Sequence, residues 1–225
     1  MCIRDRRLTG TRSRVKRIRL LARTVKKACK LYNTGGHPAA SYGAVAWGYD
    51  PTTLRQLRSL AHLAVSLDCR GQCVATNINL TIGSKHDPFV KCTKEQISMW
   101  FQIIGTYMPD MCRVSKVWWE TKSYILSVPY RQKWMRVRGP IGATIAILDD
   151  IGWNPISPYK WISETGITWR IDYTQGYGAI LCAIIATVTK IIWRISSQHY
   201  GGAGMEQGVD NTVLKRHLAY LHRQG

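Results

Sequence analysis

Two adjacent carboxylates, Asp149 and Asp150, are the residues whose types and spacing could most readily do chemistry. Paired aspartates bind the divalent metal ions that support phosphoryl transfer. In a polymerase such a pair follows an aromatic residue at a tight strand turn, whereas here Ile147 holds the aromatic position and the pair ends a stretch with helical spacing. We therefore interpret the pair as a polar helix end and expect no catalytic residues.

The cysteines and histidines could in principle hold zinc. Cys69 and Cys73 form one Cys-x3-Cys pair, followed at irregular spacing by His86, Cys92 and Cys112. Structural zinc sites favour two closely spaced pairs, and a matching second pair is missing from the sequence. The sequence also lacks a Gly-rich phosphate loop of the Lys-Ser/Thr type and a Gly-x-Ser-x-Gly elbow. We expect no metal and no cofactor.

The charge balance indicates a polyanionic partner. The 225 residues include 32 Lys and Arg against 13 Asp and Glu, which gives a formal net charge of +19. Such an excess suits nucleic acid or an anionic membrane surface, unless the charge serves no binding at all. Because Trp and Tyr accompany the cations in several segments, we favour nucleic acid.

The cysteine count and the apolar runs bear on the compartment. Seven cysteines without regular spacing favour free thiols in a reducing, intracellular environment. We see no signal-peptide pattern and no run of the ~20 apolar residues that a membrane span requires. The most apolar run, 179–189, is followed by Lys190 and Arg194, so we expect a buried helix and no membrane partner.

The stretch 12–32 predicts an amphipathic, strongly basic helix. No Asp or Glu interrupts residues 6–30, so like charges repel along the helix, and contact with phosphates would offset that repulsion. The apolar face comprises Ile18, Leu21, Ala22, Val25, Cys29 and Tyr32. The expected nucleic-acid-binding cations are Arg12, Arg14, Lys16, Arg17, Arg19, Arg23, Lys26, Lys27 and Lys30.

A second basic stretch, 131–140, surrounds one tryptophan. Interleaved cations and an aromatic ring suit phosphate pairing with base stacking, but they equally suit a covered tryptophan with cation–π neighbours. We keep both readings open. The candidate binding residues here are Lys133, Trp134, Arg136 and Arg138.

The remaining pattern predicts a mainly α fold with a small β-hairpin near 159–172. A glycine- and proline-containing turn at Gly35, Gly36 and Pro38 should end the basic helix, and Asp50 with Pro51 should start the next one. Residues 68–83 read as a loop with a possible short strand, and Thr93 with Gln96 as a capping box. Further helices are expected at 93–108, 110–126, 141–151, 179–198 and 211–223.

The segment 30–48 carries a family resemblance. Its residues Lys30, Leu31, Tyr32, Thr34, Gly35, Pro38, Tyr42, Gly43, Ala44 and Gly48 resemble the run that ends the polymerase domain of reverse transcriptases from non-LTR, LINE-type retrotransposons. Val45 departs from that pattern, because the family usually has an acidic residue there. Residues 138–169 and 199–210 are also similar to stretches downstream of that domain.

This resemblance implies a helical thumb and connector without catalytic activity of its own. The implied divisions are a thumb-like part at 11–68, a connector at 69–152 and a hairpin with helices at 153–225. Residues 1–10 would be a non-native or disordered leader, since 1–6 resemble a translated sequencing adapter. The implied partners are the RNA and DNA of a template–primer duplex and the palm and fingers of a parent RNA-directed DNA polymerase, in the nucleus.

Two alternatives remain. One is a degenerate ribonuclease H-like domain, whose two-metal chemistry would have to come from Asp172, Glu206 and Asp210. The other is a basic helical interaction protein or a decayed reading frame, which predicts that the helices share no common core.

Overall fold

The computed structural model describes residues 3–66, 71–107, 109–171 and 176–210, together with 212, 213, 216 and 220. These residues are mainly helical with a small three-stranded antiparallel sheet, which confirms the predicted fold class. The chain divides into two compact units, of which unit 1 comprises 1–40, 55–90 and 189–225, and unit 2 comprises 41–54 and 91–188. These divisions interleave along the chain, unlike the consecutive parts expected from the sequence.

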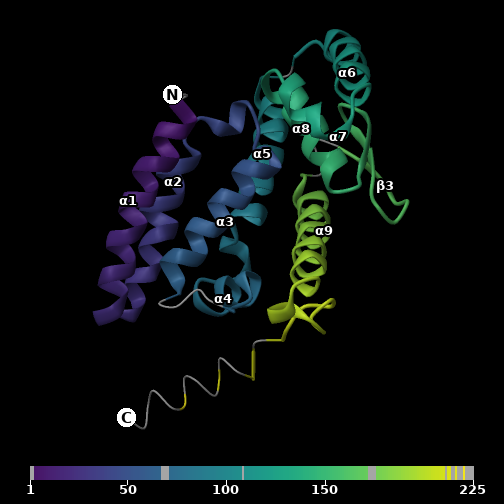
Figure 1. The fold of residues 1–225 in the computed structure, drawn as a ribbon. Helices are drawn as coiled ribbons and strands as arrows, with labels where there is room; N and C mark the ends of the chain where they lie inside the picture. Colours follow the sequence, from purple (N-terminus) through teal and green to yellow (C-terminus); the bar gives the residue numbers. More distant parts are fainter. Residues whose placement is uncertain are drawn as a thin grey trace. The chain divides into compact units, whose positions relative to one another are not determined.

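Unit 1 begins with helix α1 (Ile3–Thr24), so residues 3–10, expected as a leader, form its first turns. The basic helix does not run on to Tyr32 as predicted, because Val25 adopts an extended conformation with φ −122° and ψ 96°. The chain then runs back beside α1 through the 3-10 helix η1 (Lys26–Lys30) and the π-helical turn η2 (Tyr32–Gly36), as Figure 1 shows. The break thus falls at a β-branched residue, whose helix propensity is low, about ten residues before the glycines.

The predicted turn at Gly35, Gly36 and Pro38 is wrong, since these residues continue the helical path into α2 (His37–Ser41). A wide π-turn ahead of Pro38 suits a residue that has no N–H to donate. Gly36 is required by packing: a Cβ there would lie 2.8 Å from Cδ2 of Tyr32. The Tyr32 ring therefore fills the space beside the backbone of its own turn.

The helices of unit 1 share one core. Its buried residues come from α1, the η1–η2 segment, α3 (Pro51–Val65) and α4 (Val74–Thr81). The hydroxyl of Tyr32 donates to the carbonyl oxygen of Leu57 at 2.9 Å, which ties η2 to α3. One core therefore joins α1, the η1–η2 segment, α3 and α4. Its members are Val15, Ile18, Cys29, Tyr32, Leu60, Ala61, Ala64, Ile78 and Ile82.

Two helix starts contrast in how well the sequence predicted them. Asp50 caps α3 as expected, because its Oδ1 accepts from the backbone N–H groups of Thr52 and Thr53 at 3.0 Å. Helix α5 (Pro88–Tyr107) begins before the predicted Thr93, with Asp87 accepting from the Phe89 N–H at 2.9 Å. The predicted capping box is wrong, and Thr93 and Gln96 are instead buried within the helix.

Residues 74–81 are helical as α4, although the sequence suggested a loop with a short strand. Burial of Ile78 and Ile82 in the core explains the difference, because tertiary packing overrides the weak helix propensity of Val, Thr and Asn. The short 3-10 helix η4 (Ser84–His86) then leads to α5. Cys69 and Met108 lie outside the described residues.

Unit 2 contains α6 (Met111–Leu126), α7 (Tyr130–Lys133), the 3-10 helix η5 (Trp134–Arg136) and α8 (Gly139–Asp150). Asp110 caps α6, and Ile145, Leu148 and Ile151 are buried along the predicted face of α8. Residues 44–46 form the 3-10 turn η3 (Ala44–Ala46) of the same unit.

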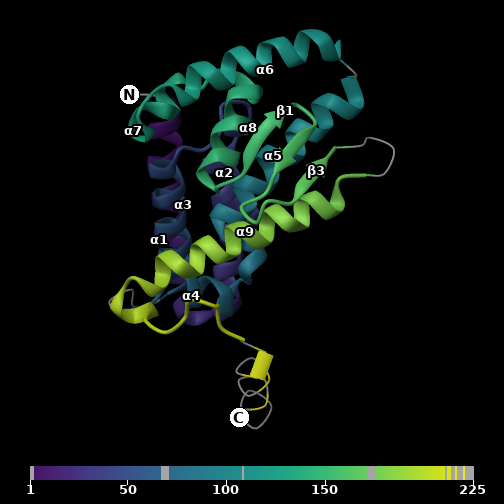
Figure 2. The ribbon, with the colours of Figure 1, turned by 90° about the vertical axis from the view of Figure 1, so that its right-hand side faces the viewer.

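The predicted hairpin is confirmed as β2 (Lys160–Ile162) and β3 (Thr168–Arg170), with Trp161 opposite Trp169. The sequence did not indicate the third strand, β1 (Asn154–Ser157), which pairs with β2 and contacts α6 and α8 (Figure 2). Indole N–H groups anchor this sheet, because Trp100 donates to Pro158 O at 3.0 Å and Trp118 to Pro155 O at 3.3 Å.

Helix α9 (Gly178–Ser197) confirms the predicted apolar helix. Among the described residues it is the helix long and apolar enough to cross a membrane by length and composition, with a mean hydropathy of 1.8 over its most apolar window. Only a third of that window is buried, so α9 is not the buried helix expected from the sequence, and Lys190 and Arg194 are exposed. The 3-10 helix η6 (Tyr200–Gly202) follows. Most of the predicted last helix lies outside the described residues. Before it, Asp210 accepts from the Thr212 N–H at 2.8 Å.

Candidate nucleic-acid interface

Helix α1 carries a line of cations beside its buried face. Arg12, Lys16, Arg19 and Arg23 follow one another at intervals of four, three and four residues, which places them on one side of an α-helix. Three of them are exposed, and Arg19 is half-buried. We call these four residues the cationic stripe. Arg14 and Arg17 are exposed elsewhere on the circumference of the helix.

The cationic stripe lies in a segment of the chain that contains no acidic residues. From residue 6 to residue 49 the chain has no Asp or Glu. The buried face of α1 instead consists of Thr11, Val15, Ile18 and Ala22, so the cations of the stripe do not face the core. Of the η1 cations, Lys27 and Lys30 are exposed, while the side chain of Lys26 is outside the described set.

Apolar side chains are also exposed at the end of α1, contrary to prediction. Leu21 and Val25 were expected in the core, but they are 54% and 58% exposed. The break explains Val25, because the periodicity of a single helix no longer applies where the chain reverses. Leu21 lies within α1 but off the face that Val15, Ile18 and Ala22 bury. With Leu20 and Leu31 they place four apolar side chains among the cations.

The second basic stretch is arranged differently. Lys133 is 2% exposed, its Nζ lies 2.7 Å from Asp149 Oδ2, and it also contacts Asp150 Oδ1. Burial alone would lower the pKa of Lys133, but Asp150 and Asp149 together raise it, so the ammonium stays charged. Lys133, predicted to bind nucleic acid, is thus buried and paired with two carboxylates of its own unit.

The neighbours of Lys133 are also engaged within unit 2. Trp134 is half-buried against Ile125 and Val137, and its indole N–H donates to Asp150 Oδ2 at 2.7 Å. Arg136 is half-buried, donates to Tyr124 O at 2.9 Å and lies over the Tyr124 ring at 4.5 Å. Of the two readings left open for this stretch, the structure therefore supports a covered tryptophan with cation–π neighbours.

Arg138 keeps an exposed side chain, but its guanidinium donates to the carbonyl oxygens of Met135 and Val137 at 3.0 and 3.1 Å. These two hydrogen bonds join residues close in sequence and stabilise the local turn. The structure thus gathers the α1 and η1 cations in one helical hairpin of unit 1, and the four residues of the second stretch serve mainly the packing of unit 2.

Asp149 and Asp150 end helix α8, as predicted. Their partners, Lys133 and the indole of Trp134, explain their presence without a metal ion. Of the ribonuclease H-like set, Asp172 lies outside the described residues, while Glu206 and Asp210 are exposed in unit 1.

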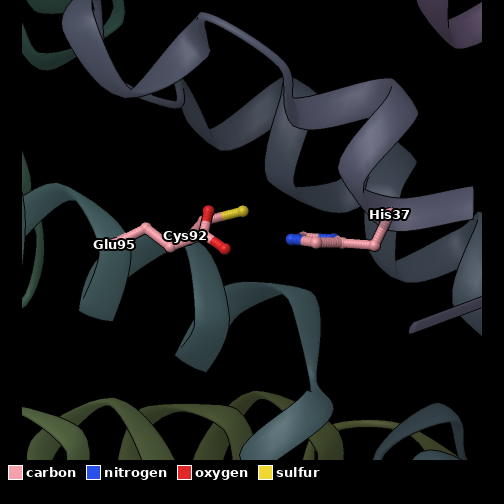
Figure 3. Close-up of side chains that lie close together, drawn as sticks. All are labelled: His37, Cys92 and Glu95. Atoms are coloured by element: carbon pink, nitrogen blue, oxygen red, sulfur yellow. The ribbon is translucent and has the colours of Figure 1, made fainter. Parts of the chain in front are cut away.

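A buried polar group in unit 2 escaped sequence reasoning. The hydroxyl of the fully buried Tyr49 donates to Glu95 Oε2 at 3.2 Å. Burial raises the pKa of Tyr49 far above its ordinary value, and Cys92 and Glu95 add to the effect. Cys92 and Glu95 come from adjacent turns of α5 (Figure 3). The three-residue spacing of Cys92 and Glu95 indicates neighbours on a helix surface, but nothing in the sequence pointed to Tyr49.

His37, also drawn in Figure 3, belongs to unit 1. Its ring lies edge-on to Tyr32, with centroids 6.2 Å apart. The cysteines and histidine considered for zinc are distributed over both units, with Cys73 and His86 in unit 1 and Cys92 and Cys112 in unit 2.

Comparisons with known proteins found no matching family model, no matching curated protein and no matching solved structure.

Proposed function

We propose that this chain holds nucleic acid electrostatically through α1 and η1 and has no catalytic role of its own. The observation that carries the proposal is the cationic stripe on α1, in a 44-residue segment, 6–49, that contains no Asp or Glu. Arg23 lies eleven positions after Arg12, which is about 16 Å along the helix. One strand of a DNA duplex presents roughly five phosphates over that length.

We further propose that the nucleic acid is a template–primer duplex and that the chain is a thumb and connector part of a LINE-type reverse transcriptase. What supports this assignment is the resemblance of residues 30–48 to the end of that family's polymerase domain. The palm and fingers of the parent polymerase would then supply the chemistry, and the nucleus would be the place of action.

Binding to a fluorescent RNA–DNA duplex, measured by anisotropy over a salt series, tests the electrostatic proposal. The affinity should fall steeply with salt, because binding releases counterions from the phosphates. A triple variant, Arg12→Gln with Lys16→Gln and Arg23→Gln, should weaken binding strongly. The matched control removes three exposed cations of unit 2, through Lys116→Gln, Arg131→Gln and Arg170→Gln.

Equal weakening by the two triple variants would mean that only net charge matters and would remove the role of α1. Affinity that is undetectable at low salt, or that does not change with salt, would remove the nucleic-acid proposal altogether. A duplex and a single strand of the same length, compared on the unmodified protein, test the template–primer part separately.

A further inference from the structure

Unit 1 contains a cleft of about 520 Å³, a volume within the usual range of small-molecule sites. Its polar lining comes from separate parts of the chain that meet in this unit. Helix α3 contributes two arginines and a serine, Cys73 precedes α4, and a histidine and a tyrosine follow α9. These residues are Arg55, Arg58, Ser59, Cys73, His199 and Tyr200.

Arg58 is the residue that points to a ligand. Its Nε lies 3.1 Å from both carboxylate oxygens of Asp87, and the two side chains are 14% and 5% exposed. Asp87 Oδ1 also accepts from the backbone N–H of Phe89. A guanidinium has five N–H donors, and Nη2 of Arg58 is buried with no acceptor among the described residues. An acceptor oxygen supplied by a ligand would satisfy this donor.

The wall opposite α3 is formed by closely packed backbone. A Cβ at Gly202 would lie 2.0 Å from Ser196 O, and one at Gly201 would lie 3.1 Å from Gly71 O. The turn of η6 is closed by the Gly202 N–H, which donates to His199 O at 2.8 Å. This packing holds Tyr200 at the edge of the cleft with its side chain fully exposed, so its ring is accessible for stacking.

We propose that this cleft binds the phosphate of a nucleotide, with Arg58 and Arg55 contacting the phosphate oxygens and the Tyr200 ring stacking on the base. Arginine suits this role because its planar fork of donors matches phosphate geometry. The nucleotide is either free or the 5′-phosphorylated end of a strand. The cleft shares no residue with the cationic stripe, so this proposal does not depend on nucleic-acid holding by α1.

Alkylation of Cys73 by iodoacetamide gives a direct readout on the full chain. Trypsin releases residues 71–85, which contain Cys73 alone, and residues 95–113, which contain Cys112 alone. Cys112 is exposed in unit 2 and serves as the internal control. Millimolar AMP should slow the alkylation of Cys73 about tenfold, as expected for a site mostly occupied, and leave Cys112 unchanged. Unchanged Cys73 alkylation, or equal slowing at both cysteines, would overturn the proposal.

The choice of probe separates the possible sources of the phosphate. Adenosine should protect Cys73 far less than AMP, and equal protection by the two would overturn the role of the phosphate. A 5′-phosphorylated tetranucleotide that protects at lower concentration than AMP would identify a strand end, whereas protection by AMP alone would identify a free nucleotide.

Two variants test the named residues without removing the fold. Arg58→Lys keeps a cation for Asp87 but lacks the second terminal nitrogen, and it should raise the AMP concentration needed for protection about tenfold. Tyr200→Ala, at a fully exposed side chain, should weaken the protection of Cys73 by AMP and leave its protection by inorganic phosphate unchanged. Arg170→Gln on β3 is the charge-matched control. Wild-type protection in Arg58→Lys would overturn the site, while protection in the α1 triple variant should stay intact.

Discussion

Nζ of Lys133 donates to Oδ2 of Asp149 at 2.7 Å, which makes a lysine from a basic stretch part of the interior of unit 2. Replacing Lys133 with Met should therefore destabilise the protein, because the nearly buried Asp150 would lose its cation. The expected loss in the free energy of unfolding is about 3 to 5 kcal/mol, measured by urea denaturation.

A double-mutant cycle isolates the Lys133 interaction. Asp150→Asn in the Lys133→Met background should recover part of the loss, because an amide needs no counterion. Lys116→Met on the exposed side of α6 is the matched control and should change stability little. Equal stability of Lys133→Met and the wild type would show that the pair contributes nothing.

Stability should decrease on mild acidification because of His62. Burial lowers the pKa of His62 below its ordinary value of 6.5, and the charge of Arg58 adds to the effect. A neutral His62 also accepts from the amide of Asn77 at 3.1 Å. Since the unfolded chain takes up this proton more readily, the contribution is complete above pH 6.5 and is lost as the pH falls below it.

The variant His62→Gln assigns that pH dependence. Urea unfolding between pH 7.5 and pH 5 should show a decline in stability for the wild type that is smaller in the variant. The same decline in both proteins would place the titrating group elsewhere.

Tyr32→Phe should destabilise unit 1 without changing its packing volume. The variant removes the hydroxyl that donates to Leu57 O and leaves a buried carbonyl with one partner fewer. The expected loss is about 1 to 3 kcal/mol, measured by thermal or urea unfolding. Tyr42→Phe, at an exposed tyrosine in the neighbouring segment, is the control and should leave the stability within error.

Single substitutions in the cationic stripe should act on the salt dependence of duplex binding. Arg12→Gln or Lys16→Gln should each reduce the slope of log affinity against log salt by about 1, the contribution of one phosphate contact. Arg131→Gln in unit 2 should leave the slope unchanged. A slope that is the same in all three variants would place the phosphate contacts away from α1.

Local signals predicted much of the helical structure, and their failures have physical reasons. Asp50 with Pro51 marked a helix start correctly, and Asp87 with Pro88 carries the same signal, which the polar pair Thr93 and Gln96 obscured. The alternation around Trp161 and Trp169 gave the hairpin, whereas β1 contains two residues, Asn154 and Pro155, that are rare in strands.

The candidate site was predictable only in part. The exposed cations of α1 followed from helical spacing and the lack of acids, which are properties of a single segment. The burial of Lys133 was not predictable, because it depends on carboxylates sixteen and seventeen positions away in the sequence. The cleft around Arg58 brings together residues up to 147 positions apart, from 55 to 202, and no spacing rule covers such separations.

The interleaving of the two units has a consequence for synthesis on the ribosome. Every residue of unit 2 has been made once position 188 is reached, whereas unit 1 also requires the segment that begins at 189. Unit 2 can therefore fold before the last segment of unit 1 has been synthesised. The core partners of α1 all lie at or before residue 82, so a chain truncated near position 188 should retain both the tryptophan-rich sheet and the packing of α1. It should lose the side of the Arg58 cleft that residues 195–202 form.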